Sequence, residues 1–115
     1  MAGKAQTGKK PLVDEDRLTV QVAQTVMHWR VAPDRFIKSG RSWIPKWRFS
    51  PCTRIEDSFL LLDNAGGTYT LSLDAKGVFT AQVRIGNRVG KASGDSKPRT
   101  ITRAIARALG LDGLQ

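Results

Sequence analysis

The sequence predicts one α+β domain in which three helices pack around a small antiparallel β-sheet, as an α-β-α sandwich. Its 115 residues are the size of a single domain, which can bury roughly two-thirds of its unfolded surface. Apolar residues recur at helical spacing in three segments. Two other segments, which precede the last of the three, alternate apolar and polar residues as strands do. Hydrophobic residues make up 40% and charged residues 25% of the chain, which is typical of a protein with a core.

The ends of the chain and its cysteine content set the outline of the domain. Residues 1–13 carry three lysines and no periodic pattern, so we expect a mobile basic tail there and the single domain at 14–115. No apolar run approaches the ~18 residues that cross a membrane, and none follows the basic start as in a signal peptide. One cysteine excludes an intrachain disulfide. These observations favour a cytoplasmic protein.

The first helix is predicted from Glu15 to Arg30. Acidic residues at its start suit the helix dipole. An apolar stripe follows at helical spacing, formed by Leu18, Val22, Val26 and Trp29. His28 lies near the end of this segment, where a lone histidine is more often a packing or capping residue than a ligand.

The next segment, Pro33 to Pro51, interleaves cations with aromatic residues. Such a mixture can stack bases and neutralise phosphates, so it is a second candidate for binding. The alternative is that Trp47 and Phe49 are strand residues that point into the core, which the alternation of bulky and polar residues favours. The binding candidates in this segment are Arg35, Lys38, Arg41, Trp43, Lys46 and Arg48.

A second helix is predicted at Arg54–Asn64, because Thr53 and Glu56 have the spacing of a capping box and apolar residues follow at helical spacing. Cys52 stands just before it. A helix N-terminus can activate a thiol, but the sequence offers no second cysteine and no histidine in register. An inert thiol is therefore expected.

The alternation of apolar and polar residues predicts a β-hairpin of Thr68–Leu73 and Val78–Ile85, with Val89–Ala92 as a short third strand. The last helix then begins at Ser96, a good N-cap, with Pro98 in its first turn, and ends at Gly110. Small apolar residues on one side of it form a narrow face that can lie flat on a sheet: Ile101, Ala104, Ile105, Ala108 and Leu109.

The same helix carries Arg99, Arg103 and Arg107 at i, i+4 and i+8, so the three lie along one edge. The chain has a net charge of +9, which favours polyanions as partners. We predict that these arginines and the cations next to them form one binding surface for an anion or nucleic acid. It comprises Arg84, Arg88, Lys91, Lys97, Arg99, Arg103 and Arg107.

Enzymatic function has the least support. The chain has one histidine, one cysteine and no phosphate-binding loop motif, so we expect no catalytic residue, no metal and no cofactor. Glu56 and Asp57 are adjacent and diverge by about 100° on a helix, so they cannot act as an acid/base pair on one face. Two non-enzymatic classes are open: a protein that binds nucleic acid or another polyanion, and a structural interaction module with a solvated basic face.

Three passages resemble the phage ABA-sandwich domain family: V-M-H-W at Val26–Trp29, P-C-T-R-I-E-D at Pro51–Asp57, and the run from Lys91 to Leu109. The resemblance implies an α+β sandwich and an accessory role for phage or prophage in the cytoplasm of a bacterial host. Its motifs carry no catalytic residue. With the charge, it points to an antagonist of a host defence such as CRISPR or nucleotide signalling, whose partner is nucleic acid, a nucleotide signal or a nucleoprotein, and not a membrane.

The last helix also resembles the end of a double-stranded-RNA-binding domain. In that family a G-x-x-S-K sequence opens the final helix, and its basic N-terminus bridges phosphates across a groove. Gly94, Ser96 and Lys97 match this pattern in kind, whereas Pro98-Arg99 replaces the usual lysine run. A module of this kind is the alternative interpretation.

Overall fold

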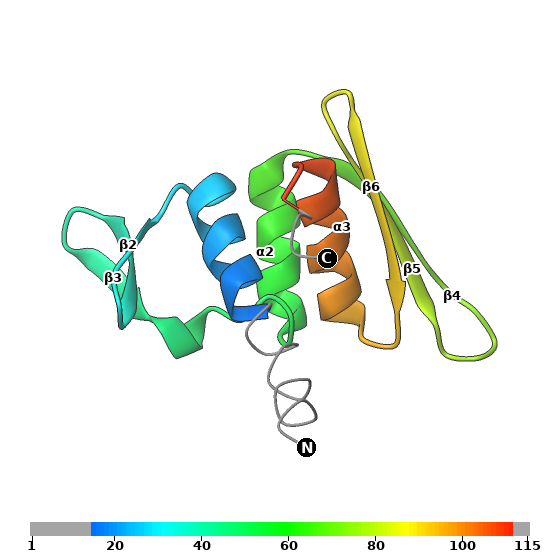
Figure 1. The fold of residues 1–115 in the computed structure, drawn as a ribbon, viewed down its shortest axis with the longest axis horizontal. Coiled ribbons are helices and arrows are strands. Elements are labelled where there is room, and N and C mark those ends of the chain that lie inside the picture. Colours follow the sequence, from blue (N-terminus) through cyan, green and yellow to red (C-terminus); the bar gives the residue numbers. More distant parts are fainter. Residues whose placement is uncertain (1–14, 112–115) are drawn as a thin grey trace, which may run out of the picture.

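The computed structural model describes residues 15–111 and has the predicted α+β architecture. Three helices stand side by side in the middle, and a three-stranded antiparallel sheet lies at each end of the helical layer (Figure 1). The predicted helices and antiparallel sheet are thus present. The structure adds a second sheet and places the helices between the two sheets. The predicted tail at 1–13 lies outside the described residues.

The first helix covers residues 15–25 and is shorter than predicted. Its stripe is buried as expected, with Leu18, Val22 and Val26 at 5% exposure or less. The prediction that the helix continues to Arg30 is wrong, because the chain turns at His28, which has a φ of 60°. This turn carries Trp29 away from the helix axis and into contact with the rings of Phe36 and Phe49, at centroid distances of 5.9 and 5.0 Å.

The first sheet is formed by β1 (Arg30–Val31), β2 (Arg35–Ser39) and β3 (Ser42–Pro45), in that order. A 3₁₀ turn, η1 (Lys46–Arg48), follows it. Phe49 is buried at 2% exposure, as the interpretation of this segment as core predicts. For Trp47 that interpretation is wrong: its side chain is 71% exposed, because it lies on the 3₁₀ turn and not on a strand.

Helix α2 (Ile55–Ala65) confirms the second predicted helix to within one residue at each end. Its predicted capping box does not form. No side chain caps the first turn, and the Thr53 hydroxyl bonds to Ser50 instead. The Asp57 carboxylate accepts a hydrogen bond from the backbone N–H of Ser50 at 2.8 Å, which ties the helix start to the preceding turn.

The second sheet contains β4 (Thr68–Leu73), β5 (Phe79–Ile85) and β6 (Arg88–Gly94), paired without interruption. Helix α3 (Lys97–Ala108) packs on it. Ser96 caps its start as predicted, and the Ser96 hydroxyl accepts a hydrogen bond from the N–H of Arg99. The small-residue face of α3 meets the sheet so closely that Gly90 of β6 contacts the helix backbone. A larger residue at this point would separate helix and sheet.

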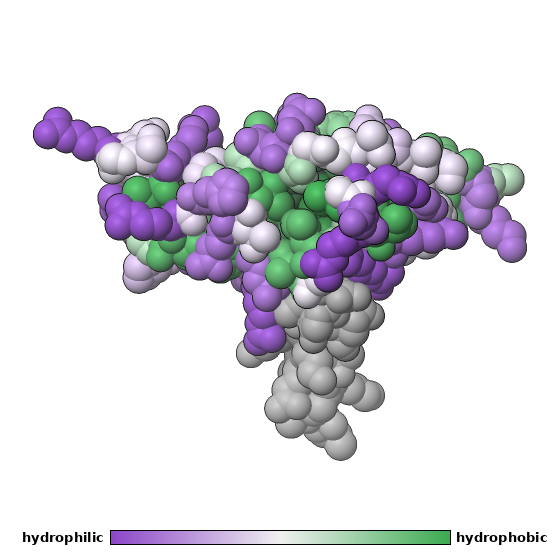
Figure 2. Space-filling view, turned by 90° about the horizontal axis from the view of Figure 1, so that it is seen from above, coloured by the Kyte–Doolittle hydropathy of each residue, from purple (hydrophilic) through white to green (hydrophobic). Residues whose placement is uncertain are grey.

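One core joins the three helices to both sheets. Its largest fully buried side chains include Val22 of the first helix, Leu61 of α2 and Ile105 of α3, together with Phe36 and Val83 of the two sheets. In the view from above, hydrophobic residues appear across the middle of the molecule, and hydrophilic side chains project at both ends (Figure 2). The sheet ends of the molecule are thus its more hydrophilic parts in this view.

Candidate anion-binding surfaces

The arginine row, Arg99, Arg103 and Arg107, lies along α3 as its spacing predicts. Two of the three have partners among the described residues. Arg99 donates from Nε to the carboxylate of Glu15, which lies 84 residues earlier in the sequence and is 12% exposed. Arg107 donates to the backbone carbonyl of Lys91 on β6 at 2.6 Å. Much of this charge therefore holds the first helix and the sheet edge to α3.

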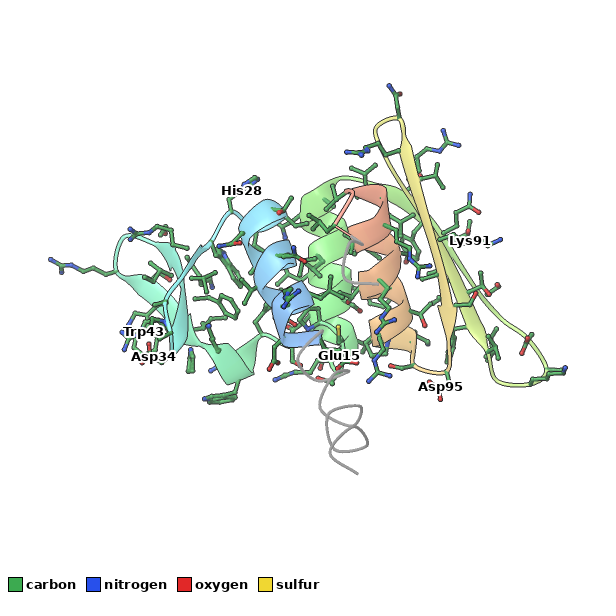
Figure 3. The ribbon with its side chains drawn as sticks, viewed as in Figure 1. Glu15, His28, Asp34, Trp43, Lys91 and Asp95 are labelled. Carbon is green, nitrogen blue, oxygen red and sulfur yellow. The ribbon has the colours of Figure 1, made fainter. Side chains whose placement is uncertain are left out.

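A cavity of about 280 Å³ opens beside the arginine row at the start of α3. Arg99 and Arg103 line one side of it, and Glu15 and Asp95 supply carboxylates. Figure 3 shows both acidic residues near the lower end of the helical layer. Because the two acids balance the two arginines, this cavity has little excess positive charge for a phosphate.

The other cations predicted for this surface are spread over different faces. Arg84 and Lys91 belong to the outer face of the second sheet, and Lys91 points away from the helices (Figure 3). The guanidinium of Arg88 lies against Gly110, just after the end of α3. The ammonium of Lys97 lies 5.6 Å from the ring centroid of Phe79. The structure thus brings the three arginines together but places Arg84 and Lys91 across the sheet from them.

The cations and tryptophans of the first sheet and η1 form a second basic surface, called here the hairpin surface. Within residues 30–48 there are six cations against a single acid, Asp34, which gives this stretch a net charge of +5. Among the described residues, only Arg35 of these six pairs with a carboxylate, that of Asp34. The members of the hairpin surface are Arg30, Arg35, Lys38, Arg41, Trp43, Lys46, Trp47 and Arg48.

Trp43 and Arg35 are stacked at one side of this surface. The guanidinium carbon of Arg35 lies 4.0 Å from the ring centroid of Trp43, which is 47% exposed, and this is a close cation–π contact. Asp34 lies beside them (Figure 3), and its hydrogen bond with Arg35 lowers the pKa of its carboxyl. The pair holds one aromatic face and one planar cation in a fixed arrangement.

Trp47 stands at a cavity of about 470 Å³ between the first helix and η1, called here the Trp47 cavity. Its apolar lining comes from Val20, Phe36 and Phe49, and its charged lining is one cation, Lys46, and one acid, Asp16. The volume falls within the roughly 300–1,000 Å³ of ordinary ligand pockets. An aromatic ring beside an apolar floor suits a flat, apolar group.

Sequence reasoning identified the cations of the hairpin surface but not this cavity. The alternation of bulky and polar residues around Trp47 predicts a core position for its side chain. The walls of the cavity come from residues 16–20 and 36–50, which are brought together only by the packing of the first helix on the first sheet. A pattern of residues that are close in sequence cannot predict such a contact.

The structure places Cys52 in the core and His28 at the surface. Cys52 is 2% exposed, and burial, with a smaller contribution from the charge of Glu15, raises the pKa of its thiol to about 12. The thiol is therefore protonated at neutral pH and a poor nucleophile. His28 is exposed at the turn after the first helix (Figure 3). Within residues 15–111 no group of acidic, histidine or cysteine side chains has the arrangement of a metal site.

Comparison with known proteins gives a likeness of fold. No protein-family profile matches the chain, and no curated protein matches it. Among solved structures, a phage protein from Bacillus cereus ATCC 14579 matches with a TM-score of 0.69 at 14% sequence identity, over 84% of this chain and 87% of that one. The chain thus has a fold similar to that of a phage protein, as the resemblance to a phage family led us to expect.

The described residues also bear on membrane association. No helix within residues 15–111 combines the length and the apolar character needed to cross a bilayer.

Proposed function

We propose that this protein is a non-enzymatic accessory binding protein of phage type, and that it binds single-stranded nucleic acid through the hairpin surface. The observation that carries the proposal is Trp47, a large aromatic side chain that is 71% exposed next to a cavity with an apolar floor. Exposing such a ring to water costs free energy that a stacked base would recover. Lys46 and Arg48 flank it in the sequence and can meet the phosphates on either side of that base.

Several features favour a single strand over a duplex at this surface. Trp47 presents an exposed ring, and Trp43 is partly exposed with Arg35 stacked on its ring. Unpaired bases stack on such rings, whereas bases inside a duplex already stack on each other. The cations of the hairpin surface surround these rings rather than forming a long row. A protein of this kind acts by occupying nucleic acid, or a nucleoprotein, that belongs to a host defence system. The phage-type fold and the net charge of +9 support this role.

The test is fluorescence anisotropy with labelled oligonucleotides, single-stranded and double-stranded, across a series of salt concentrations. Losing one stacking aromatic costs about 1–3 kcal/mol, so Trp47→Ala is expected to raise the Kd for the single strand by about 5- to 150-fold. Val89→Ala is the matched control, because Val89 is 47% exposed on the other sheet. Arg48→Gln is expected to flatten the slope of log affinity against log salt by about 0.7. Lys76→Gln, in the β4–β5 turn, should leave that slope unchanged.

The proposal fails if Trp47→Ala binds the single strand as tightly as Val89→Ala does while both keep the melting temperature of the wild type. Absence of salt-dependent binding to any probe would instead favour a structural interaction module.

A second candidate is the double-stranded-RNA-binding interpretation, favoured by the arrangement at the start of α3. There Ser96 caps the helix, Lys97 opens it, and Arg103 lines the adjacent cavity. The variant Arg103→Gln plus Arg107→Gln is the test, on the same probes and salt series. Preference for the duplex, together with weaker binding and a flatter salt slope in this variant but not in Trp47→Ala, would select this candidate.

A further inference from the structure

Strand β4 is an open sheet edge without the protection that the other edges of the described residues carry. Edge strands in soluble proteins are usually short, or carry charge or proline, because their free backbone groups can pair with another chain. In the first sheet β1 has only two residues, and β3 ends at Pro45. At the β6 edge, Arg107 occupies the carbonyl of Lys91. By contrast β4, Thr68–Leu73, has six residues, no charge, no proline and unbroken pairing with β5.

The side chains of β4 give this edge an apolar side. Tyr69, Leu71 and Leu73 point to the face on which the helices pack, yet Tyr69 is 46% and Leu73 is 59% exposed. They stay exposed because α3 packs over β5 and β6 rather than over β4. Phe59 of α2 reaches Tyr69 at a centroid distance of 5.9 Å. An apolar strip therefore runs beside an open row of backbone hydrogen-bonding groups.

We propose that β4 pairs with β4 of a second copy of this chain, antiparallel, to form one six-stranded sheet across a two-fold axis. The alternation of β4 is complementary to itself in this arrangement. With Leu71 opposite the partner's Leu71, Tyr69 lies opposite the partner's Leu73, and Thr70 lies opposite the partner's Ser72. Apolar side chains then meet on one face and hydroxyls on the other, whereas a slip of one residue would mix the two faces.

The distribution of charge favours a second copy over a polyanion at this edge. Residues 33–54 have a net charge of +5 and residues 84–107 of +6, whereas residues 55–83 contain four acids and one lysine, a net charge of −3. Strand β4 itself carries no cation with which to hold a phosphate backbone. Two copies of a chain with a charge of +9 can approach each other there without opposing their basic surfaces. The hairpin surface lies at the opposite end of the molecule, so both copies would keep it exposed (Figure 1).

The test is sedimentation velocity of the full chain over a range of concentrations. We expect the wild type to dimerise reversibly. Leu73→Lys adds a charge at an exposed edge position and is expected to weaken dimerisation at least tenfold. Val89→Lys, at an exposed position on β6, is the matched control and should dimerise like the wild type. Circular dichroism spectra identical to that of the wild type show that the variants fold.

A second measurement tests the register. Leu71→Cys places two thiols opposite each other at the two-fold axis, and the native Cys52 is buried. Mild oxidation is expected to give a covalent dimer of Leu71→Cys and not of Val89→Cys. A wild type that stays monomeric at every concentration, or a dimer that Leu73→Lys does not weaken, would overturn the proposal. Binding of single-stranded nucleic acid through Trp47 is independent of either result.

Discussion

The contact between β6 and α3 makes Gly90→Ala a sharp test of the packing. A Cβ atom built on Gly90 overlaps the carbonyl oxygen of Ala104 and the nitrogen of Ala108, and it lies 3.0 Å from the Cα of Ala108. All three atoms belong to the backbone of a helix. They cannot move aside by a side-chain rotation, so the whole helix has to shift away from the sheet.

The cost follows from the size of that shift. Inserting one carbon into a packed core typically costs 1–3 kcal/mol, and the rigid neighbours here put Gly90→Ala at the upper end, about 3 kcal/mol. In a domain of this size 1 kcal/mol lowers the melting temperature by about 4 °C, so we expect a fall of about 12 °C. A shift of α3 also loosens Ile101 and Ile105, which are at most 1% exposed in the core.

Thermal unfolding followed by circular dichroism measures this effect. Gly94→Ala is the matched control, because Gly94 lies on the same face of the same strand, and its Cβ would meet only the Thr100 hydroxyl, at 3.2 Å. We expect this control to cost less than about 1 kcal/mol. If Gly90→Ala melts no lower than Gly94→Ala, the close approach of β6 and α3 is wrong.

Two further predictions concern His28 and Cys52. His28 has a φ of 60°, which glycine adopts without strain, so His28→Gly is expected to raise stability by about 0.5–1 kcal/mol in thermal unfolding, whereas Gln24→Gly inside the helix should lower it. The pKa of the Cys52 thiol is raised by burial from 9.0 to about 12, so the unfolded chain loses this proton first as the pH rises. Stability is therefore expected to fall above pH 9, by about 1.4 kcal/mol per pH unit at most, and Cys52→Ser should remove this dependence in denaturant titrations. Neither Cys52→Ser nor His28→Gln is expected to change nucleic-acid binding. A loss of binding at unchanged stability would show that the substituted side chain has a role in function.

The sequence by itself determined the elements whose signals are local. Helices α2 and α3 and strands β4 and β5 follow from apolar periodicity over a few residues, and the cap at Ser96 from the residue type at one position. These patterns succeed because an element of ten residues buries one face against almost any neighbour. The small residues Ala104 and Ala108 also predict a helix that lies close to a sheet.

Only the tertiary structure decided the rest. The first helix ends at residue 25, and the turn at His28 places Trp29 against the rings of Phe36 and Phe49, which belong to a later segment of the chain. The arginine row is spaced as predicted, yet Glu15, 84 residues away in the sequence, neutralises part of its charge. Trp47 alternates like a core residue, but the 3₁₀ turn directs it to solvent. In each case the contact that decides the structure joins residues that are distant in sequence, or it depends on how two elements pack. A pattern of neighbouring residues cannot predict the free energy of such a contact.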